Sequence, residues 1–466
     1  MIDEFPERLL EVDGIGKKKY ESIIEDFLNS LSFKLTEDQI STIYDILNDM
    51  KKDVRMNRLV LGDVGSGKTI VAIVAILANY LSGYQSTFMA PTEILAKQHY
   101  QSIKNYFSEY NINIVLLTGS LTKKSKEKLY SDIELGNADI VIGTHALLNE
   151  KMSFNNLGLV ITDEQHRFGV NQRNLLQNKG TNGEADVIYL SATPIPRTYA
   201  LTIYGDMDVS IIKEMPKGRL PVKTKVFNAK EMNSVYKLME EELINKHQIY
   251  VIAPLIEENE ELDLTNVNTL RDKMNLIFGN KYRIDIVHGK MKAKEKDLIM
   301  EEFKHNIVNI LISTTVIEVG VDVSNATMMV IFDANRFGLS TLHQLRGRVG
   351  RGADQSYCIL VTGFKLAEDT RKRIEIMVRT NDGFEIAEAD LKLRGPGDLE
   401  GTQQSGMAFD LKIADLAHDG QILQLARDVA EKIIEEDPTC ELPKYELLWR
   451  QLKNLRKTNI NWSAIS

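Results

Sequence analysis

The sequence has few of the residues that cross-link a small fold or cross a membrane. Among 466 residues there are two cysteines, Cys358 and Cys440, which exclude a disulfide scaffold and a four-cysteine zinc site. No stretch approaches the ~18 consecutive apolar residues of a membrane helix, and the chain opens with Asp3, Glu4 and Glu7 where a secretory signal would be basic. We therefore expect no membrane partner and a cytoplasmic location.

An excess of positive charge is also absent. Lys and Arg number 57 against 66 Asp and Glu, a formal net charge of −9. This balance argues against a protein that coats nucleic acid with its whole surface, but it leaves room for one basic groove. The length of 466 residues allows about three domains with real cores.

Short apolar runs alternate with segments of helical period, a pattern typical of βαβ units and parallel sheets. The predicted strands of a first series are 58–61, 87–90, 113–117, 140–142, 159–161 and 187–190. Those of a second series are 249–252, 284–287, 308–312, 328–331 and 357–361. Residues 213–225 predict a linker between the two series, and the polar span 257–266 predicts an exposed loop. Two similar blocks indicate a duplicated α/β architecture, followed by a helical tail.

A glycine-rich motif follows the first predicted strand and precedes a helix predicted at 68–81. It matches G-x-x-x-x-G-K-[ST], in which backbone N–H groups surround phosphates at the positive end of a helix. We expect Lys68 to reach the β- and γ-phosphates and the Thr69 hydroxyl to hold Mg²⁺. The predicted nucleotide-binding residues of this loop are Gly62, Gly65, Ser66, Gly67, Lys68 and Thr69.

An acidic pair ends another apolar strand. Asp163 is the predicted second Mg²⁺ ligand, and Glu164 is placed to activate the attacking water. Alone, such a pair is more often a solvated acidic turn, but an upstream P-loop favours the catalytic interpretation. His166 could be a packing or capping residue, or it could link this pair to Ser191 and Thr193, and we favour the linking role.

The second series of strands carries a group of arginines. The run Gln344-Leu345-Arg346-Gly347-Arg348-Val349-Gly350-Arg351 can supply positive charge to a phosphoryl-transfer site, an effect of about 10³ to 10⁵ in rate for an arginine finger. The alternative is a solvated basic turn. These arginines reach the nucleotide only if the two blocks face each other across a cleft. We predict catalytic roles for Gln344, Arg348 and Arg351, beside Lys68 and Glu164.

These motifs resemble superfamily-two helicases, and specifically the RecG family of branched-DNA helicases, from about Phe33 to Ser466. The most specific segments are Asp163 to Val170, whose glutamine–histidine pair favours RecG over transcription-coupled repair translocases, and the tail from Arg379 to Gly406. The resemblance implies two RecA-like parallel-sheet domains and a helical C-terminal region with a translocation hairpin and loop. It implies units at 1–31, 32–215, 216–365 and 366–466.

The same resemblance assigns further residues. Phe33 and Gln39 would hold the adenine, and Asp322 would belong to the nucleotide site. Residues implied to contact DNA or to couple hydrolysis to movement are Thr92, Gly119, Thr144, His145, His166, Ser191, Thr193, Arg197, His288, Thr314, Arg379, Arg394 and Gln404. On a chain of net negative charge, local cations such as Lys97 and Lys290 would also be needed for DNA.

The sequence differs from the RecG pattern at the start of the chain. In the RecG family a wedge domain of the oligonucleotide-binding fold precedes the motor, and the residues before Phe33 are too few for such a barrel. The turn at Val12 to Lys17 is typical of a simple helix start and only weakly of a helix-hairpin-helix DNA contact. The resemblance therefore implies ATP hydrolysis and translocation on duplex DNA, and it assigns no junction-splitting wedge to the residues before Phe33.

We expect an ATP-dependent DNA helicase or translocase that remodels branched DNA, such as stalled forks and Holliday junctions, in recombination and repair. Its expected cofactors are ATP and Mg²⁺, and its expected partners are branched and duplex DNA. We expect a monomer, with a single-strand-binding protein as candidate protein partner. The alternatives are an ATP-binding regulatory module on DNA, a bare duplex translocase without branch unwinding, an RNA helicase and a transcription-coupled translocase.

Overall fold

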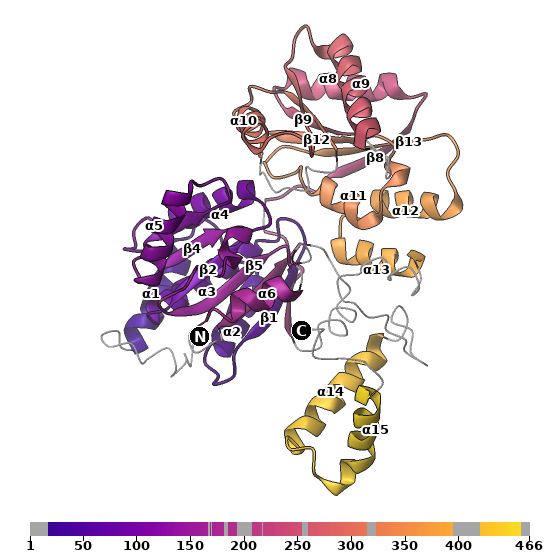
Figure 1. The fold of residues 1–466 in the computed structure, drawn as a ribbon. Coiled ribbons are helices and arrows are strands. Elements are labelled where there is room, and N and C mark those ends of the chain that lie inside the picture. The colour runs from indigo at the N-terminus through magenta and orange to yellow at the C-terminus, as the bar shows by residue number, and fades with distance from the viewer. Residues whose placement is uncertain are drawn as a thin grey trace.

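The computed structural model describes residues 17–165, 168, 170–180, 185–192, 207–216, 218–253, 260–314, 323–394 and 420–457. Of the described residues 47% are helical, and they form two parallel sheets with flanking helices (Figure 1). This arrangement confirms the predicted α/β fold class with two RecA-like sheets and a helical C-terminal region.

The first sheet has seven strands in the order β3-β4-β2-β5-β6-β1-β7, and its pairs are parallel. Its strands are β1 (Asn57–Gly62), β2 (Gln85–Met89), β3 (Ile114–Leu117), β4 (Ile140–Gly143), β5 (Leu157–Asp163), β6 (Asp186–Ser191) and β7 (Asp208–Ile212). The central strands are buried along their length because helices cover both faces. Strand β7 was not predicted, since it lies at the edge and is partly exposed.

The helices of this unit are α1 (Lys17–Ser30), α2 (Glu37–Asp49), α3 (Lys68–Leu81), α4 (Glu93–Tyr106), α5 (Lys123–Glu134), the 3₁₀ turn η2 (His145–Leu148) and α6 (Val170–Gln177). Helix α3 has the predicted bounds and is almost entirely buried; Ile73, Ile76 and Leu77 are fully inaccessible. Its apolar sequence therefore anchors the P-loop in the core of the unit.

The second sheet repeats the topology of the first. Its six strands run in the order β10-β11-β9-β12-β13-β8, and all pairs are parallel. They are β8 (Lys223–Asn228), β9 (Gln248–Ile252), β10 (Ile284–Val287), β11 (Ile310–Ser313), β12 (Ala326–Ile331) and β13 (Tyr357–Thr362). Counted in chain order, both sheets have the sequence third, fourth, second, fifth, sixth, first strand. The predicted duplication is thus confirmed at the level of topology.

Two local predictions in this unit were wrong. The end of the predicted linker, from Lys223, belongs to edge strand β8, whose half-exposed sequence lacks an apolar run. The predicted loop is helical from Glu260 onward, within α9 (Glu260–Phe278), because acidic residues favour a helix start and polarity alone does not define a loop. The other elements are α8 (Met232–Ile244), α10 (Ala293–Lys304), η6 (Ala334–Arg336) and α11 (Leu339–Arg346).

The C-terminal region is helical. It contains α12 (Glu368–Arg379), α13 (Gly383–Arg394), α14 (Gly420–Glu436), η8 (Pro443–Tyr445) and α15 (Glu446–Lys457). Helices α11, α12 and α13 contact one another, and α12 also contacts β8, whereas α14 and α15 form a separate pair at the yellow end of the chain (Figure 1). Within the described ranges, no helix combines the length and apolar character needed to cross a membrane.

Candidate functional site

Predicted site residues of the first unit gather at one edge of its sheet. They are the P-loop after β1, Thr92 after β2, Gly119 after β3, Thr144 after β4, Asp163 at the end of β5 and Ser191 at the end of β6. Because all pairings are parallel, these carboxyl ends meet, as ligand sites of open α/β sheets do.

The P-loop wraps around the side chain of Lys68. Gly65 and Gly67 have φ angles of 79° and 82°, in the left-handed region that favours glycine. Lys68 Nζ donates to the carbonyl oxygens of Gly62, at 2.8 Å, and Asp63, at 2.9 Å. The loop thereby holds the ammonium group at the N-terminal, positive end of α3.

Charged side chains of both signs affect the pKa of Lys68. Burial is the main reason that the pKa of Lys68 lies below its ordinary value of 10.5; the charges of Glu164 and Asp163 oppose the effect of burial, and Arg351 adds to it. The acidic pair and an arginine of the second unit therefore share one electrostatic site with Lys68.

The two adjacent carboxylates have opposite pKa shifts. Burial acts to raise the pKa of Asp163, but the hydrogen bond and charge of His99, together with Lys68, hold it below 3.8. Burial and the charge of Asp163 raise the pKa of Glu164 above 4.5 against the effects of Lys68 and Arg348. Glu164 also has a φ of 50°, a conformation uncommon outside glycine that often marks functional sites. Neighbouring carboxyl groups with divergent pKa values suit different roles.

Gln39 supports the P-loop from α2. Its side chain is 1% exposed, and its Nε2 donates to the Ser66 carbonyl oxygen at 2.8 Å. Its Oε1 accepts from Thr36 N at 2.9 Å, which completes a capping box at the start of α2. Phe33, predicted beside it, is 41% exposed.

The predicted arginines of the second unit lie near enough to this site to affect its pKa values. Arg348 and Arg351 follow α11, and their charges act on Glu164 and Lys68 respectively. Burial is the largest cause that lowers the pKa of Arg351 to about 10. Gln344, half-buried on α11, is the third predicted residue of this segment.

Three contacts between the units were not predicted. A Cβ atom added to Gly347 would lie 2.8 Å from Val64 Cβ, so the backbone after α11 packs directly on the P-loop. Arg219 Nη1 donates to the Val64 carbonyl oxygen at 2.6 Å, and its Nε donates to that of Gly350 at 2.9 Å. In the sequence, this contact was indicated only by the presence of a basic residue, Arg219, in the predicted linker.

Asp63, at a variable position of the P-loop motif, makes the third contact. Its Oδ1 lies 2.5 Å from His343 Nε2, and its Oδ2 accepts from the backbone N of Gly383 at 3.2 Å. His343 Nδ1 lies 3.1 Å from Arg346, which donates to the Thr380 carbonyl oxygen at 2.9 Å. The P-loop is thus joined to α11 and to the turn between α12 and α13.

The remaining predicted DNA residues have varied surroundings. Thr92 caps α4, and His145 opens η2 with its ring centroid 5.3 Å from that of Phe168. In the second unit, Thr314 follows β11 and is buried. His288 follows β10, and burial is the largest cause that lowers its pKa, aided by Lys296 and Lys290. The Lys97 ammonium, a predicted DNA cation, lies 2.5 Å from Asp297 of α10.

Some predicted residues lie outside the described residues: His166, Thr193, Arg197, Asp322 and Gln404. Arg394 ends α13, and its side chain is likewise outside the described part. Arg379, at the end of α12, is exposed and forms an ion pair with Glu385 at 2.6 Å.

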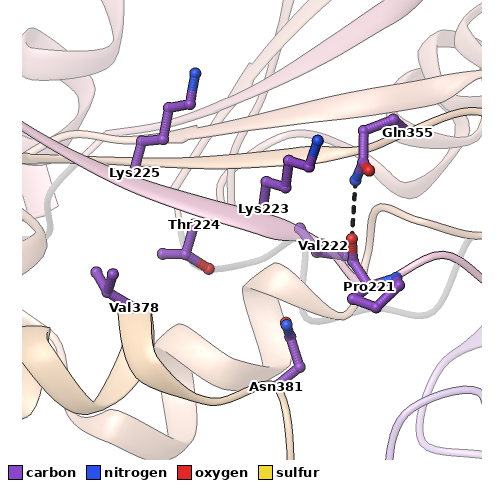
Figure 2. A pocket seen from close by; sticks show the side chains of 8 residues that line it. All are labelled: Pro221, Val222, Lys223, Thr224, Lys225, Gln355, Val378 and Asn381. Atoms are coloured by element: carbon purple, nitrogen blue, oxygen red, sulfur yellow. Dashed lines mark hydrogen bonds between the residues drawn. The ribbon is translucent and has the colours of Figure 1, made fainter.

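An open groove lies between β8 and α12 (Figure 2). Its volume is about 460 Å³, and Lys223 and Lys225 extend on the opposite side of β8 from Thr224, Val378 and Asn381. It contains none of the predicted site residues, so it does not define the nucleotide site.

The P-loop edge fits a divalent cation bound with a nucleotide. A hydroxyl and a carboxylate, from Thr69 and Asp163, are the oxygen ligands that Mg²⁺ prefers. The Ser66 Oγ is buried and has no hydrogen-bond partner among the described residues. Within that same part of the chain, no group of three or more His, Cys, Asp or Glu side chains could hold a metal alone. A cation here would therefore depend on nucleotide oxygens.

The chain is similar to known helicase sequences along its length. Residues 36–201 match the DEAD/DEAH box helicase family, residues 231–353 the helicase conserved C-terminal domain, and residues 380–466 the family "ATP-dependent DNA helicase RecG, domain 3, C-terminal".

Longer relatives align with nearly the whole chain. The ATP-dependent DNA helicase RecG of Bacillus subtilis is 47% identical over 95% of the chain and 64% of its own length. That of Aquifex aeolicus is 50% identical over 93% of the chain and 56% of its own length. A solved structure of RecG bound to a three-way DNA junction matches with 44% identity and a TM-score of 0.71, over 87% of this chain and 52% of that one. The chain thus spans less than two thirds of these relatives.

Two parallel sheets of one topology, with a P-loop on the first and the arginine segment of the second packed on that loop at Gly347, agree with the two helicase domain matches and define the superfamily-two helicase class. The specific matches narrow the assignment. Within this class, the chain is similar to RecG helicases over nearly its whole length.

Proposed function

We propose that the protein is an ATP-dependent DNA helicase or translocase that remodels branched DNA such as stalled forks and Holliday junctions. One observation carries the proposal: the arginine segment of the second unit packs on the P-loop of the first. A Cβ atom on Gly347, next to Arg348, would lie 2.8 Å from Val64 Cβ, and the charges of Arg348 and Arg351 contribute to the pKa shifts of Glu164 and Lys68. Arginines supplied from a separate unit make hydrolysis depend on closure of the cleft, and cycles of closure can move a polymer.

The chain's own residues have distinct roles in this reaction. Backbone N–H groups of the P-loop and Lys68 bind the phosphates, and Gln39 with Phe33 holds the base. Glu164 accepts a proton from the attacking water, since its raised pKa brings it closer to neutral pH than an ordinary carboxylate. Arg348 and Arg351 stabilise charge in the transition state, with Gln344 beside them.

Mg²⁺ would be held by Thr69 and Asp163, and when bound it neutralises charge on the phosphate oxygens. Asp322 is the predicted nucleotide residue of the second unit. We also propose four units with bounds at 1–31, 32–215, 216–365 and 366–466. We also propose a cytoplasmic monomer with a single-strand-binding protein as a partner.

DNA would lie across the carboxyl edges of the two sheets. Thr92, Gly119, Thr144, His145, His288 and Thr314 follow strands there. The coupling of hydrolysis to movement is assigned to Ser191 and, on the helical hairpin α12–α13, to Arg379 and Arg394. The same role is assigned to His166, Thr193, Arg197 and Gln404. Because such contacts go mainly to phosphates, binding should be independent of sequence and weaken steeply with salt.

The test is ATP turnover at one salt concentration with no DNA, single strands, linear duplex and a four-way junction, in parallel with Lys68→Ala. Stronger stimulation by the junction than by linear duplex supports branch remodelling. Equal stimulation by every duplex would indicate a duplex translocase that does not remodel branches. No stimulation by any DNA overturns the proposal. Turnover that persists in Lys68→Ala overturns the site assignment.

A further inference from the structure

His99, on α4, makes a direct contact with the predicted metal-binding carboxylate. Its Nε2 lies 2.9 Å from Asp163 Oδ2. The histidine is 8% exposed, and its ring centroid lies 4.5 Å from that of Phe88, a fully buried residue of β2. Packing therefore fixes the imidazole ring with Nε2 facing the carboxylate.

This contact, with one other, fixes the orientation of the Asp163 carboxylate. Its second oxygen, Oδ1, accepts from the backbone N of Glu164 at 3.0 Å. Since an ionised carboxylate only accepts hydrogen bonds, the imidazole supplies the hydrogen at Nε2. Each oxygen thus accepts from one donor among the described residues and keeps lone-pair capacity for a cation.

The helix that carries His99 also contacts a predicted DNA segment. Thr92 caps α4, and the Glu93 Oε1 accepts from the backbone N of Ser120, next to Gly119. Thr92 and Gly119 are both predicted DNA residues. His99 lies seven residue steps after Thr92, about 10 Å along the helix axis, so a rigid element joins the two places.

Helix α4 contacts the second unit as well. Ile94 packs against the core that contains Leu342 and Leu345 of α11, and the Lys97 ammonium lies 2.5 Å from Asp297 of α10. A change in the closure of the two units therefore acts on the same helix that holds the Asp163 carboxylate.

We propose that His99 is a positioning residue that orients Asp163 for the nucleotide-bound cation, and that α4 transmits DNA engagement to this carboxylate through it. The proposal rests on the role of Asp163 in the proposed function. Hydrogen bonds to metal ligands commonly contribute about 10- to 100-fold to metal affinity or activity.

The test uses two replacements at one position. His99→Phe keeps a ring against Phe88 but removes the donor, whereas His99→Gln places an amide N–H where Nε2 lies. Gln101→Ala, whose side chain is exposed on the same helix, is the matched control. Circular dichroism melting of each variant verifies folding.

The first readout is binding of Mn²⁺ in the presence of ADP, followed by electron paramagnetic resonance without DNA. His99→Phe should weaken Mn²⁺ binding by about tenfold, and His99→Gln and Gln101→Ala should stay close to wild type. The second readout is the ratio of DNA-stimulated to basal ATP turnover, which should fall in His99→Phe and recover in His99→Gln.

Asp163→Asn separates the role of Asp163 from that of His99. If it leaves Mn²⁺ binding unchanged, the proposed role of Asp163 is wrong, and the role of His99 with it. If Asp163→Asn weakens binding but His99→Phe does not, only the positioning role is overturned. Weakened Mn²⁺ binding with an unchanged DNA stimulation ratio in His99→Phe overturns transmission through α4.

Discussion

His343 Nε2 lies 2.5 Å from Oδ1 of Asp63, a residue 280 positions earlier in the chain. The contact joins the P-loop to α11, the helix that precedes the two predicted catalytic arginines. Burial acts to raise the pKa of Asp63, but the hydrogen bond and charge of His343 hold it below 3.8. The carboxylate therefore stays ionised at neutral pH, and its contribution to stability is lost only as the pH falls through this lowered value.

Asp63→Asn should reduce DNA-stimulated ATP turnover by about tenfold, because it weakens the contact that brings the arginines to the P-loop. ATP affinity should change little, since Lys68 bonds to the Asp63 backbone and not to its side chain. A double-mutant cycle with His343→Ala provides the control: residues in contact give a non-additive result. If the two losses simply multiply, the contact does not contribute to turnover.

Glu164→Gln should reduce ATP turnover by about 10² or more, the usual size of a general-base effect, while ATP remains bound. Glu127→Gln, on the exposed surface of α5, is the matched control and should behave as wild type. Single-turnover hydrolysis and fluorescent-nucleotide binding separate the two effects. Loss of nucleotide binding in Glu164→Gln would instead indicate a structural role.

Much of the fold could be predicted because it depends on local pattern. Strands buried on both faces are continuous apolar runs, and α3 is apolar with a glycine turn before it. Edge strands β7 and β8 were not predicted in this way, since the half-exposed residues of an edge strand show no distinctive hydrophobic period.

The motif residues of the site could be predicted, but the contacts between them could not. His99, Arg219 and His343 belong to no motif that identifies their partners, which are 64, 155 and 280 positions away. Such pairs arise when strand order brings distant loops to one edge. A single sequence gives no signal of which side chains will meet there.

A buried ion pair should stabilise the start of β1, which leads into the P-loop. Arg58 Nη2 lies 2.5 Å from Asp49 Oδ2, and both residues are buried. Asp49→Ala should cost about 3 kcal/mol of unfolding free energy, because it leaves a buried guanidinium group less well paired. Asp45→Ala should cost less than about 1 kcal/mol, since Asp45 is half exposed and 3.6 Å from Arg58. Urea unfolding of the first unit measures both, and equal costs would contradict the assignment.

Arg351→Lys should make ATP turnover sensitive to alkaline pH. Burial, aided by the charge of Arg219, lowers the pKa of Arg351 to about 10, so the guanidinium remains protonated at physiological pH. A lysine starts from an ordinary pKa of about 10.4, and the same surroundings would lower it into the range of roughly pH 7 to 9. The protonated form is the active one, so turnover of the variant should fall as the pH rises through this range, while wild-type turnover stays level. Arg336→Lys, on an exposed residue of η6, is the control and should follow the wild-type profile. A variant that is equally impaired at every pH would mean that the shape of the guanidinium, and not its charge alone, is required.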